Sequence, residues 1–171
     1  MSELVYLREP TTADFPLLDA WDESPEFRGE INDFGLPRKP AAEKFADGFI
    51  REQAGSLIVC ETATDTPVGT IDWRPSMYGP PPESMAFQFG ISLAPEVRGK
   101  GFGPVAIRLL ADYLFEHTKT NRVEGSCDVE NVPSQRAMLK AGFVYEGAIR
   151  QAQWRHGAYH DLMYFSRIRG E

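Results

Sequence analysis

Apolar and polar residues alternate along several short segments of the chain, a period of two that is typical of half-buried strands. On this pattern we expect strands over residues 4–8, 56–61, 68–73, 84–93, 122–129, 143–150 and 158–167. Other segments repeat their apolar residues every three to four positions, which indicates helices. We expect these over residues 13–21, 41–53, 104–117 and 133–141, with Gly142 as the C-terminal cap of the last.

Two segments are rich in residues that interrupt regular structure. Residues 22–40 contain many glycines, prolines, aspartates and asparagines, and residues 75–83 include a Gly-Pro-Pro-Pro run. We expect long loops there, the first with at most a short turn of helix. The order is then strand, helix, helix, three strands, helix, strand, helix and two strands. Hairpins mixed with helical crossovers predict one α/β domain over residues 1–171, with helices packed on a mixed sheet.

The composition is that of an ordinary globular protein, with 42% apolar and 25% charged residues. No apolar run reaches the length of a transmembrane helix, so we expect no membrane partner. A formal net charge of -7 argues against nucleic acid as a partner, because such proteins need a basic face to displace counterions. An acidic surface suits cationic substrates, and it equally keeps ordinary proteins dispersed.

The two cysteines, Cys60 and Cys127, lie far apart and lack the spacing of metal ligands. We expect two buried thiols, no metal site and a reducing cytoplasm.

Candidate chemistry concentrates at residues 91–104, where a strand ends, a glycine-rich turn follows and a helix begins. A helix start presents unpaired backbone N–H groups and the positive end of the helix dipole, which attract phosphate. The glycines let the backbone close around an anion, and Arg98 and Lys100 add positive charge. Pro104 is tolerated near the first helical position because its missing N–H would be unpaired there.

Two other phosphate motifs fit this turn less well. A nucleotide-triphosphate loop needs Ser or Thr directly after its lysine, whereas Gly101 follows Lys100. Residues 101–106 match the looser dinucleotide pattern GxGxxA, and Glu124 lies about 20 positions further on. That motif belongs between parallel strands, while the elements before this turn are predicted to be hairpins.

The turn Arg98-Gly99-Lys100-Gly101-Phe102-Gly103 resembles the (Arg/Gln)-x-x-Gly-x-(Gly/Ala) loop of the GNAT superfamily of N-acetyltransferases. Residues 131–150, which begin Asn-Val-Pro-Ser, resemble the same family, in particular the branch that includes ribosomal-protein alanine N-acetyltransferases. The resemblance is strong over residues 87–165 and weak over the N-terminal half. It implies a mixed, mostly antiparallel seven-stranded sheet flanked by about four helices.

The resemblance also implies acetyl-CoA as co-substrate, and no metal. The backbone of the glycine turn would hold the pyrophosphate, and the preceding strand end would pair with the pantetheine arm. That strand and strand 122–129 would splay apart to admit the thioester, where a backbone N–H can stabilise the developing oxyanion. The cofactor-binding residues predicted in this way are Ile91, Ser92, Leu93, Arg98, Gly99, Lys100, Gly101, Phe102, Gly103 and Asn131.

Transfer to an amine needs a neutral amine and a proton for the departing thiolate. Ser134 matches the serine of the family's Asn-x-x-Ser pattern and would protonate or hydrogen-bond the thiolate sulfur. Serine at such a position is equally an ordinary helix N-cap or first-turn residue, and one hydroxyl could do both. Tyr145 and Tyr164 are alternative acids, although tyrosines in strands more often pack in the core.

The base is harder to assign, because relatives in this branch often carry a glutamate where this chain has Gln88. An amide cannot take the proton, so we expect Glu83 to serve, with Asp72, a water chain or an already neutral amine as alternatives. Asp161 matches an aspartate that is usual in the family's last hairpin, where a turn or ion-pair role is the simpler interpretation. His160 beside Asp161 is the histidine worth testing.

Together these features predict an N-acetyltransferase that moves acetyl from acetyl-CoA to a primary amine by direct attack. The amine would be a small molecule or a protein N-terminus. The alternatives are a non-catalytic acyl-CoA sensor of the same fold, a longer acyl group, and a carrier-protein donor. The intact pyrophosphate loop disfavours the carrier, which has no second phosphate to hold. We expect a monomer or homodimer.

Overall fold

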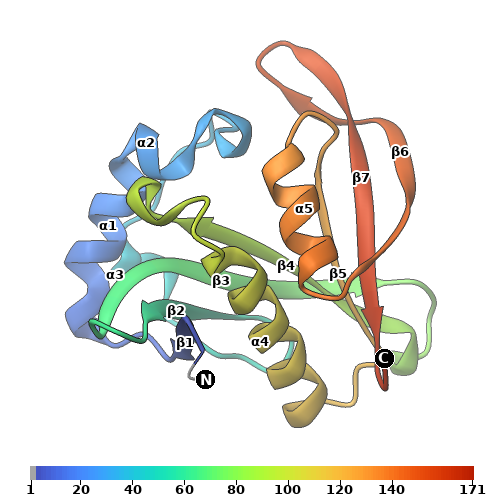
Figure 1. Ribbon diagram of the computed structural model, residues 1–171, viewed down its shortest axis with the longest axis horizontal. Coiled ribbons are helices and arrows are strands. Elements are labelled where there is room, and N and C mark those ends of the chain that lie inside the picture. The colour runs from blue at the N-terminus through green and yellow to red at the C-terminus, as the bar shows by residue number, and fades with distance from the viewer. Residues whose placement is uncertain (1–2) are drawn as a thin grey trace.

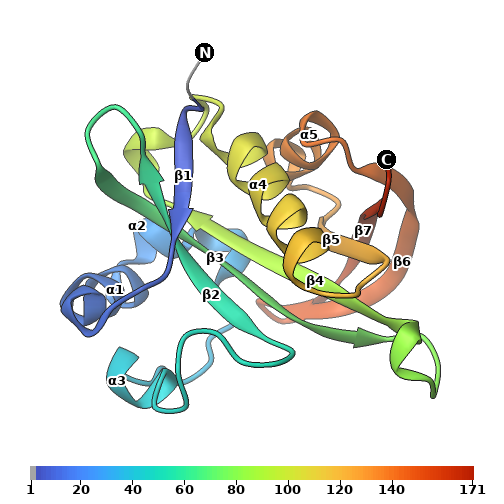
Figure 2. The same cartoon turned by 90° about the horizontal axis from the view of Figure 1, so that it is seen from below.

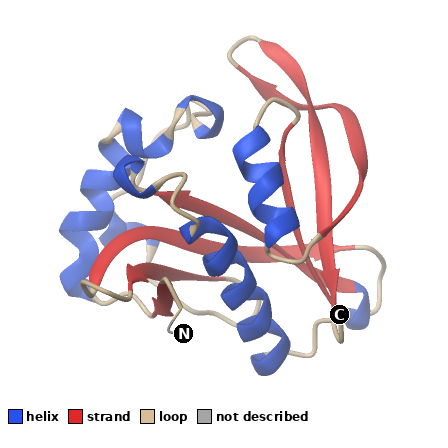
Figure 3. Ribbon diagram, viewed as in Figure 1, coloured by secondary structure: helices blue, strands red, loops and turns tan. Residues whose placement is uncertain are grey.

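The computed structural model describes residues 3–171 of the chain. Within this range the strands form one seven-stranded sheet in the order β1-β2-β3-β4-β5-β7-β6 (Figures 1 and 3). Neighbouring strands are antiparallel, except that β4 and β5 run parallel. The strands are β1 (Val5–Arg8), β2 (Gly55–Glu61), β3 (Thr66–Met77), β4 (Met85–Leu93), β5 (Arg122–Asp128), β6 (Val144–Arg155) and β7 (Ala158–Ile168).

Helices cover both faces of the sheet, with α4 and α5 on one side and α1 and α3 on the other (Figure 2). The bounds are α1 (Phe15–Glu23), α2 (Pro25–Arg28), α3 (Ala41–Lys44), α4 (Phe102–His117) and α5 (Val132–Lys140). The alternation of side chains along β2 shows the two layers. Leu57 and Val59 belong to the core that includes α4, whereas Ile58 and Cys60 pack with residues of α1 and α3.

The predicted order of strands and helices is confirmed, but the expected helix over residues 41–53 is wrong. The helix α3 ends at Lys44, and Gly48 in the following turns has a φ of +95°, which helical residues do not adopt. Phe45 and Phe49, expected on one helical face, instead pack together from these turns with ring centroids 4.8 Å apart. Local periodicity therefore predicted correctly that Phe45 and Phe49 pack together, but it predicted a helix where the chain forms turns.

The two expected loops contain more regular structure than predicted. Residues 22–40 include α2 and a 3₁₀ turn at Glu30–Asn32. At the other loop, β3 continues through Pro75 to Met77. Pairing between β2 and β3 ends at Gly55, opposite Trp73, so Pro75 pairs only with β4. A proline is tolerated in such a place because one edge of the strand has no ladder to maintain.

None of the helices in the described part of the chain is both long and apolar enough to cross a bilayer.

Candidate functional site

The two parallel strands, β4 and β5, pair over only a small part of their length. Within residues 3–171 their register contains two pairs, Phe87↔Val123 and Gln88↔Glu124, although β4 continues to Leu93. Beyond Gln88 the strands diverge, as the resemblance implied (Figure 1). The carboxyl-terminal half of β4 therefore has one edge that β5 does not occupy.

The Phe89 ring packs on Gly125 and fills the space where β4 and β5 begin to diverge. A Cβ on Gly125 of β5 would lie 2.6 Å from ring atoms of Phe89 and 2.9 Å from Sδ of Met138. Contacts that short do not occur, so a larger residue at position 125 would push the ring away. Phe89 also meets Phe143 edge to face, with centroids 5.4 Å apart.

The predicted pantetheine-binding residues lie at the free edge of β4. Ile91, Ser92 and Leu93 are half-buried, and their backbones pair with β3 on the other side. Their second edge faces the space left by β5. Backbone groups there are available to a ligand that extends along the strand.

The glycine turn between β4 and α4 has the geometry that a bound anion needs. Gly99 and Gly101 have φ values of +76° and +88°, and Gly101 is the N-cap of α4. No side chain caps this end of the helix, so the first N–H groups of Phe102 and Gly103 remain available. A Cβ on Gly99 would meet nothing within 4 Å, which indicates open space beside the turn.

The structure gives the two cations of this turn different roles. The Arg98 guanidinium donates to the backbone oxygens of Leu93, Glu26 and Phe27, at 2.9, 2.9 and 2.6 Å. It therefore connects the end of β4 to α2 instead of projecting beside the turn. Lys100 is exposed and is the cation left to attract a phosphate.

Asn131 and Ser134 lie at the start of α5, next to β5. Asn131 is the N-cap, and its Oδ1 accepts a hydrogen bond from the Ser134 N–H at 3.1 Å. Ser134 is thus a first-turn residue and not the cap, so its hydroxyl is not needed to start the helix. Burial raises the pKa of the Cys127 thiol on β5 to about 11, while a hydrogen bond with Ser134 opposes that rise. The Ser134 hydroxyl therefore lies at the β5 side of the divergence.

Glu83, the expected base, is not brought to this site. It lies in an exposed 3₁₀ turn, Pro82–Ser84, before β4 begins. The strand from Met85 to Ile91 alone spans about 20 Å at the usual rise per residue. The two predicted catalytic residues, Glu83 and Ser134, are therefore on different parts of the molecule.

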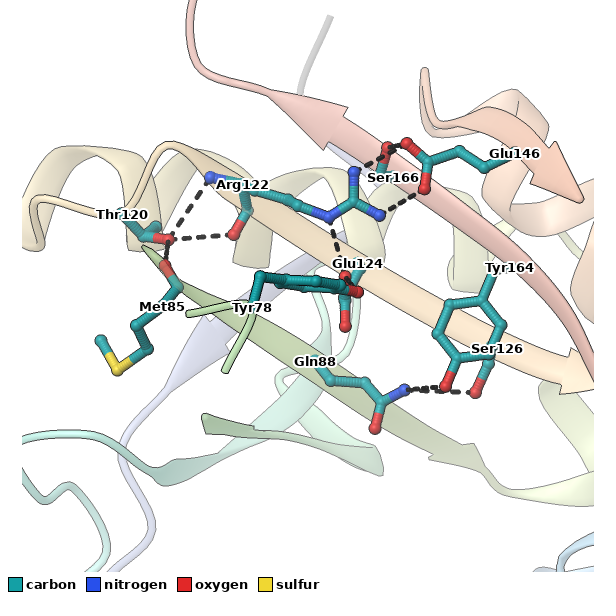
Figure 4. Close-up of polar contacts among 10 residues, drawn as sticks. All are labelled: Tyr78, Met85, Gln88, Thr120, Arg122, Glu124, Ser126, Glu146, Tyr164 and Ser166. Atoms are coloured by element: carbon teal, nitrogen blue, oxygen red, sulfur yellow. Dashed lines mark hydrogen bonds and ion pairs between the residues drawn. The ribbon is translucent and has the colours of Figure 1, made fainter. Parts of the chain in front are cut away.

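Gln88, at the position of the family's glutamate, lies on the face of the sheet opposite α4, since its neighbours Phe87 and Phe89 pack in the core with that helix. It bonds residues of β3, β5 and β7, of which Figure 4 shows those of β5 and β7. Its Nε2 donates to Oγ of Ser126 at 3.3 Å and to the hydroxyl of Tyr164 at 3.4 Å. Its Oε1 accepts from Arg74 at 2.6 Å. Tyr164 therefore belongs to the same polar group as Gln88, whereas Tyr145 packs on Phe165 with centroids 5.4 Å apart.

Glu124, which sequence reasoning did not assign to the site, lies directly beside Gln88 on β5. It is fully buried, and its Oε2 accepts from the Tyr78 hydroxyl at 2.6 Å and from Arg122 at 2.8 Å (Figure 4). Its Oε1 is buried with no hydrogen-bond partner among residues 3–171. A charged residue between Val123 and Gly125 in a strand was the available signal.

Asp72 on β3, one of the alternatives for the base, faces a cavity of about 290 Å³ between the sheet and α1–α3. A Cβ on Gly90 of β4 would lie 3.2 and 3.3 Å from the two Asp72 carboxylate oxygens. The carboxylate therefore lies over β4 just beyond the point where the strands diverge. Loss of solvation raises the pKa of Asp72, against the opposing charges of Arg74 and Lys44.

The residues of the last hairpin have structural partners. Asp161 accepts a hydrogen bond at 2.7 Å from the N–H of Gln151, where β6 is bulged. His160 pairs with Asp128 at 2.9 Å and not with Asp161. Asp128, His160 and Glu130 could together offer ligand atoms to a metal. The guanidinium of Arg155, 2.6 Å from Asp128, already supplies a positive charge there.

Comparison with known families decides what this arrangement belongs to. The family model described as "Acetyltransferase (GNAT) domain" matches residues 5–144. The chain belongs to the GNAT acetyltransferase family. The divergence of β4 and β5 and the glycine turn before α4 are the two GNAT features that the resemblance predicted.

The names of relatives of this GNAT protein refer to several different amine acceptors. The L-amino acid N-acetyltransferase AaaT of Escherichia coli is 25% identical over 172 residues, covering 99% of this chain and 100% of AaaT. The spermidine N(1)-acetyltransferase of Vibrio cholerae is 27% identical over 120 residues, 70% of this chain and 67% of that protein. YdaF of Bacillus subtilis is 36% identical over 84 residues, so the match spans 49% of this chain and 46% of YdaF.

Solved structures confirm the fold. Spermidine N-acetyltransferase from Vibrio cholerae, in complex with CoA and spermine, superposes with a TM-score of 0.80 at 18% identity, covering 96% of this chain and 95% of that one. RimL, a ribosomal L7/L12 α-N-protein acetyltransferase in complex with CoA, gives 0.80 at 20% identity, with 98% and 95% coverage. At these identities the likeness shows the GNAT fold alone.

Proposed function

We propose that this protein is an N-acetyltransferase that takes acetyl from acetyl-CoA and passes it to a primary amine. One observation carries the proposal: the two parallel strands diverge after Gln88, beside a glycine turn that opens a 16-residue helix. A strand edge for the pantetheine arm and unpaired helical N–H groups for the pyrophosphate thus lie on the same ligand path.

In this proposal the donor is held mainly by backbone. The turn from Arg98 to Gly103 surrounds the pyrophosphate, with Lys100 as the nearby charge, and Ile91–Leu93 pair with the pantetheine arm. The thioester then lies between β4 and β5, where a β4 N–H polarises its carbonyl. Asn131 orders the start of α5 beside it.

Acetyl transfer by direct attack mainly requires positioning and proton handling. The amine nitrogen attacks the carbonyl carbon, the C–S bond breaks, and the thiolate takes a proton. Ser134, next to Cys127 on β5, is the proposed donor or hydrogen-bond partner for the sulfur. Tyr164 is the alternative acid, since it lies with Gln88 and Ser126 on the opposite face.

The names of relatives support an amine acceptor without fixing which amine. They include an L-amino acid N-acetyltransferase, a spermidine N(1)-acetyltransferase and a ribosomal-protein-serine acetyltransferase. Both cysteines are buried free thiols, which supports our proposal of a reducing cytoplasm as the protein's compartment.

A charge placed in the glycine turn tests the donor site. Gly101→Glu puts a carboxylate where the pyrophosphate is proposed to lie, so acetyl-CoA affinity measured by calorimetry should fall at least about 100-fold. Gly157→Glu is the matched control, because Gly157 also has a positive φ, +81°, but lies in the β6–β7 turn. Equal affinity in the wild type and Gly101→Glu would refute this placement.

Turnover separates the enzyme from an acyl-CoA sensor, an alternative that Gln88 keeps open. The assay measures thiol release from acetyl-CoA with a panel of amines and compares acetyl-CoA with longer acyl-CoA donors. We expect release with acetyl-CoA and at least one amine. Tight binding of acetyl-CoA without release for any amine in the panel would favour the sensor.

A further inference from the structure

The cavity between the sheet and α1–α3 is built to hold an apolar group. Trp21, Phe27, Phe45 and Phe49 line it, and the Trp21 and Phe27 rings stack with centroids 4.7 Å apart. Its volume of about 290 Å³ is at the lower end of the range for small-molecule sites. A ligand here is therefore small and partly apolar or aromatic.

One carboxylate in this cavity has no side-chain partner within the described part of the chain. The Asp72 side chain takes part in none of the side-chain hydrogen bonds or ion pairs formed by residues 3–171, and it is open to the cavity. The same carboxylate lies over Gly90, with its oxygens 3.2 and 3.3 Å from where a Cβ would be. An ammonium group bound to Asp72 would thus be held next to the free part of β4.

The remaining charges of the cavity are mostly positive. Lys44 and Asp22 both line it and pair with each other at 3.4 Å. Once that pair is set aside, the charged residues that line the cavity are two cations, Arg51 and Arg74, and one anion, Asp72. Arg74 donates from one Nη to Gln88, and a guanidinium has further N–H groups to offer. The cavity therefore presents one site for a cation and two groups that attract an anion.

Resting on the proposed function, we propose that this cavity is the acceptor site and that its substrate is a free α-amino acid with an apolar or aromatic side chain. Asp72 binds the amino group, Arg74 and Arg51 bind the carboxylate, and the aromatic residues hold the side chain. A polyamine fits poorly, because it would bring several positive charges to a site that already has an excess of them. A peptide N-terminus lacks the carboxylate that the arginines attract.

In this arrangement Asp72 takes over the role that Gln88 cannot perform. The bound ammonium gives one proton to the Asp72 carboxylate, which later releases it to solvent. The neutral nitrogen attacks the thioester carbonyl, the C–S bond breaks, and the second nitrogen proton reaches the departing thiolate. The sum is N-acetyl amino acid, free CoA and one released proton, so atoms and charge balance.

The surroundings of Asp72 act on its pKa in both directions, with the net shift upward. Loss of solvation raises its pKa, while Arg74 on the same strand and Lys44 of α3 lower it. Asp22 of α1 and Arg51 also face the cavity. We expect the acidic limb of the kcat/KM profile to lie above the ordinary carboxyl range and to disappear when Asp72 is replaced.

The first test compares acceptors that differ in one group. Thiol release from acetyl-CoA is measured with L-phenylalanine, L-phenylalaninamide, 2-phenylethylamine, spermidine and a short peptide. We expect L-phenylalanine to have the highest kcat/KM, at least roughly tenfold above the two analogues without a carboxylate. Turnover of spermidine or the peptide but not of L-phenylalanine overturns this inference and leaves the proposed function intact. No turnover with any amine overturns both.

The second test uses variants of the cavity. Asp72→Asn should lower kcat/KM for L-phenylalanine by about 100-fold or more, with acetyl-CoA affinity unchanged by calorimetry. It should fold normally, because the Asp72 residue is exposed and its side chain makes no hydrogen bond or ion pair with other residues in the range 3–171. Arg74→Gln should raise KM for L-phenylalanine but not for 2-phenylethylamine. Asp47→Asn, in an exposed position that does not line the cavity, is the control. Wild-type kinetics and pH profile in Asp72→Asn would overturn the assignment.

Discussion

Two glycines shape the region where the proposed donor and acceptor sites adjoin. Gly125 lets Phe89 lie against β5 at the root of the divergence, and Gly90 leaves room for the Asp72 carboxylate over β4. Each position tolerates no ordinary side chain without moving its neighbour, since a Cβ would come within 2.6 Å of Phe89 or 3.2 Å of Asp72. The geometry of the site thus depends on these two glycines as much as on its polar side chains.

Ser134 could have a catalytic role or a structural role, and a single substitution distinguishes the two. Because Asn131 caps α5, removing the Ser134 hydroxyl should not weaken the helix start. Ser134→Ala should therefore lower kcat by about tenfold or more while acetyl-CoA affinity changes little. Steady-state kinetics together with calorimetry check this. Equal losses of kcat and of acetyl-CoA affinity would instead indicate a purely structural role.

Between elements, the glycine turn is connected to the rest of the molecule by Arg98. Its guanidinium satisfies carbonyl groups from β4 and from the α2 segment. The turn that starts α4 is thereby fixed to a helix that lines the proposed acceptor cavity through Phe27. The contacts of Arg98 therefore connect the proposed donor site to the proposed acceptor cavity. The phosphate-binding motif in the sequence does not suggest such a connection.

Replacing the two cations of the turn should separate stability from binding. Arg98→Ala leaves three backbone carbonyls without their donor, so the free energy of unfolding should fall by about 1–3 kcal/mol. Lys100→Ala removes an exposed charge and should leave stability unchanged. It should weaken acetyl-CoA binding, most clearly at low salt. Urea unfolding and calorimetry at two salt concentrations measure both effects; a stable Arg98→Ala protein would contradict the connecting role.

Across the whole molecule, a buried ion pair joins segments that are distant in sequence. Asp128 of β5 and Arg155 of β6 are paired at 2.6 Å with almost no exposure. Arg155 also donates to the backbone oxygen of Ile31 at 2.9 Å. The last hairpin is thereby held against the segment that follows α2.

Breaking this pair from one side should be costly, because it leaves a buried charge without compensation. Arg155→Met should lower the free energy of unfolding by about 3–5 kcal/mol. The double variant Asp128→Asn with Arg155→Met should recover much of that loss. Chemical denaturation of Arg155→Met, of Asp128→Asn and of the double variant gives the coupling energy. Additive losses in the double variant would show that the two charges do not depend on each other.

The sequence by itself determined the order of the elements and predicted a phosphate-binding turn before α4. Both follow from local rules: side-chain period, the residues that start helices, and glycines where the backbone must turn. The GNAT family was recognised in a different way, through the resemblance of residues 98–103 and 131–150 to motifs of that family. The sequence also led to Ser134 as the predicted acid, and to Glu83 as the predicted base with Asp72 as an alternative. It could not rank Glu83 against Asp72 by position, because nothing local shows which acidic residue lies near the divergence.

Tertiary structure alone decided which side chains are neighbours. Asp72 lies over Gly90, and Glu124 beside Gln88, only because of the register between strands distant in sequence. A shift of one residue in that register would turn each side chain to the other face. In the same way, the carbonyl partners of Arg98 in and beside α2 depend on long-range packing. Side-chain period fixes which face a residue belongs to, and pairing between strands fixes what it meets there.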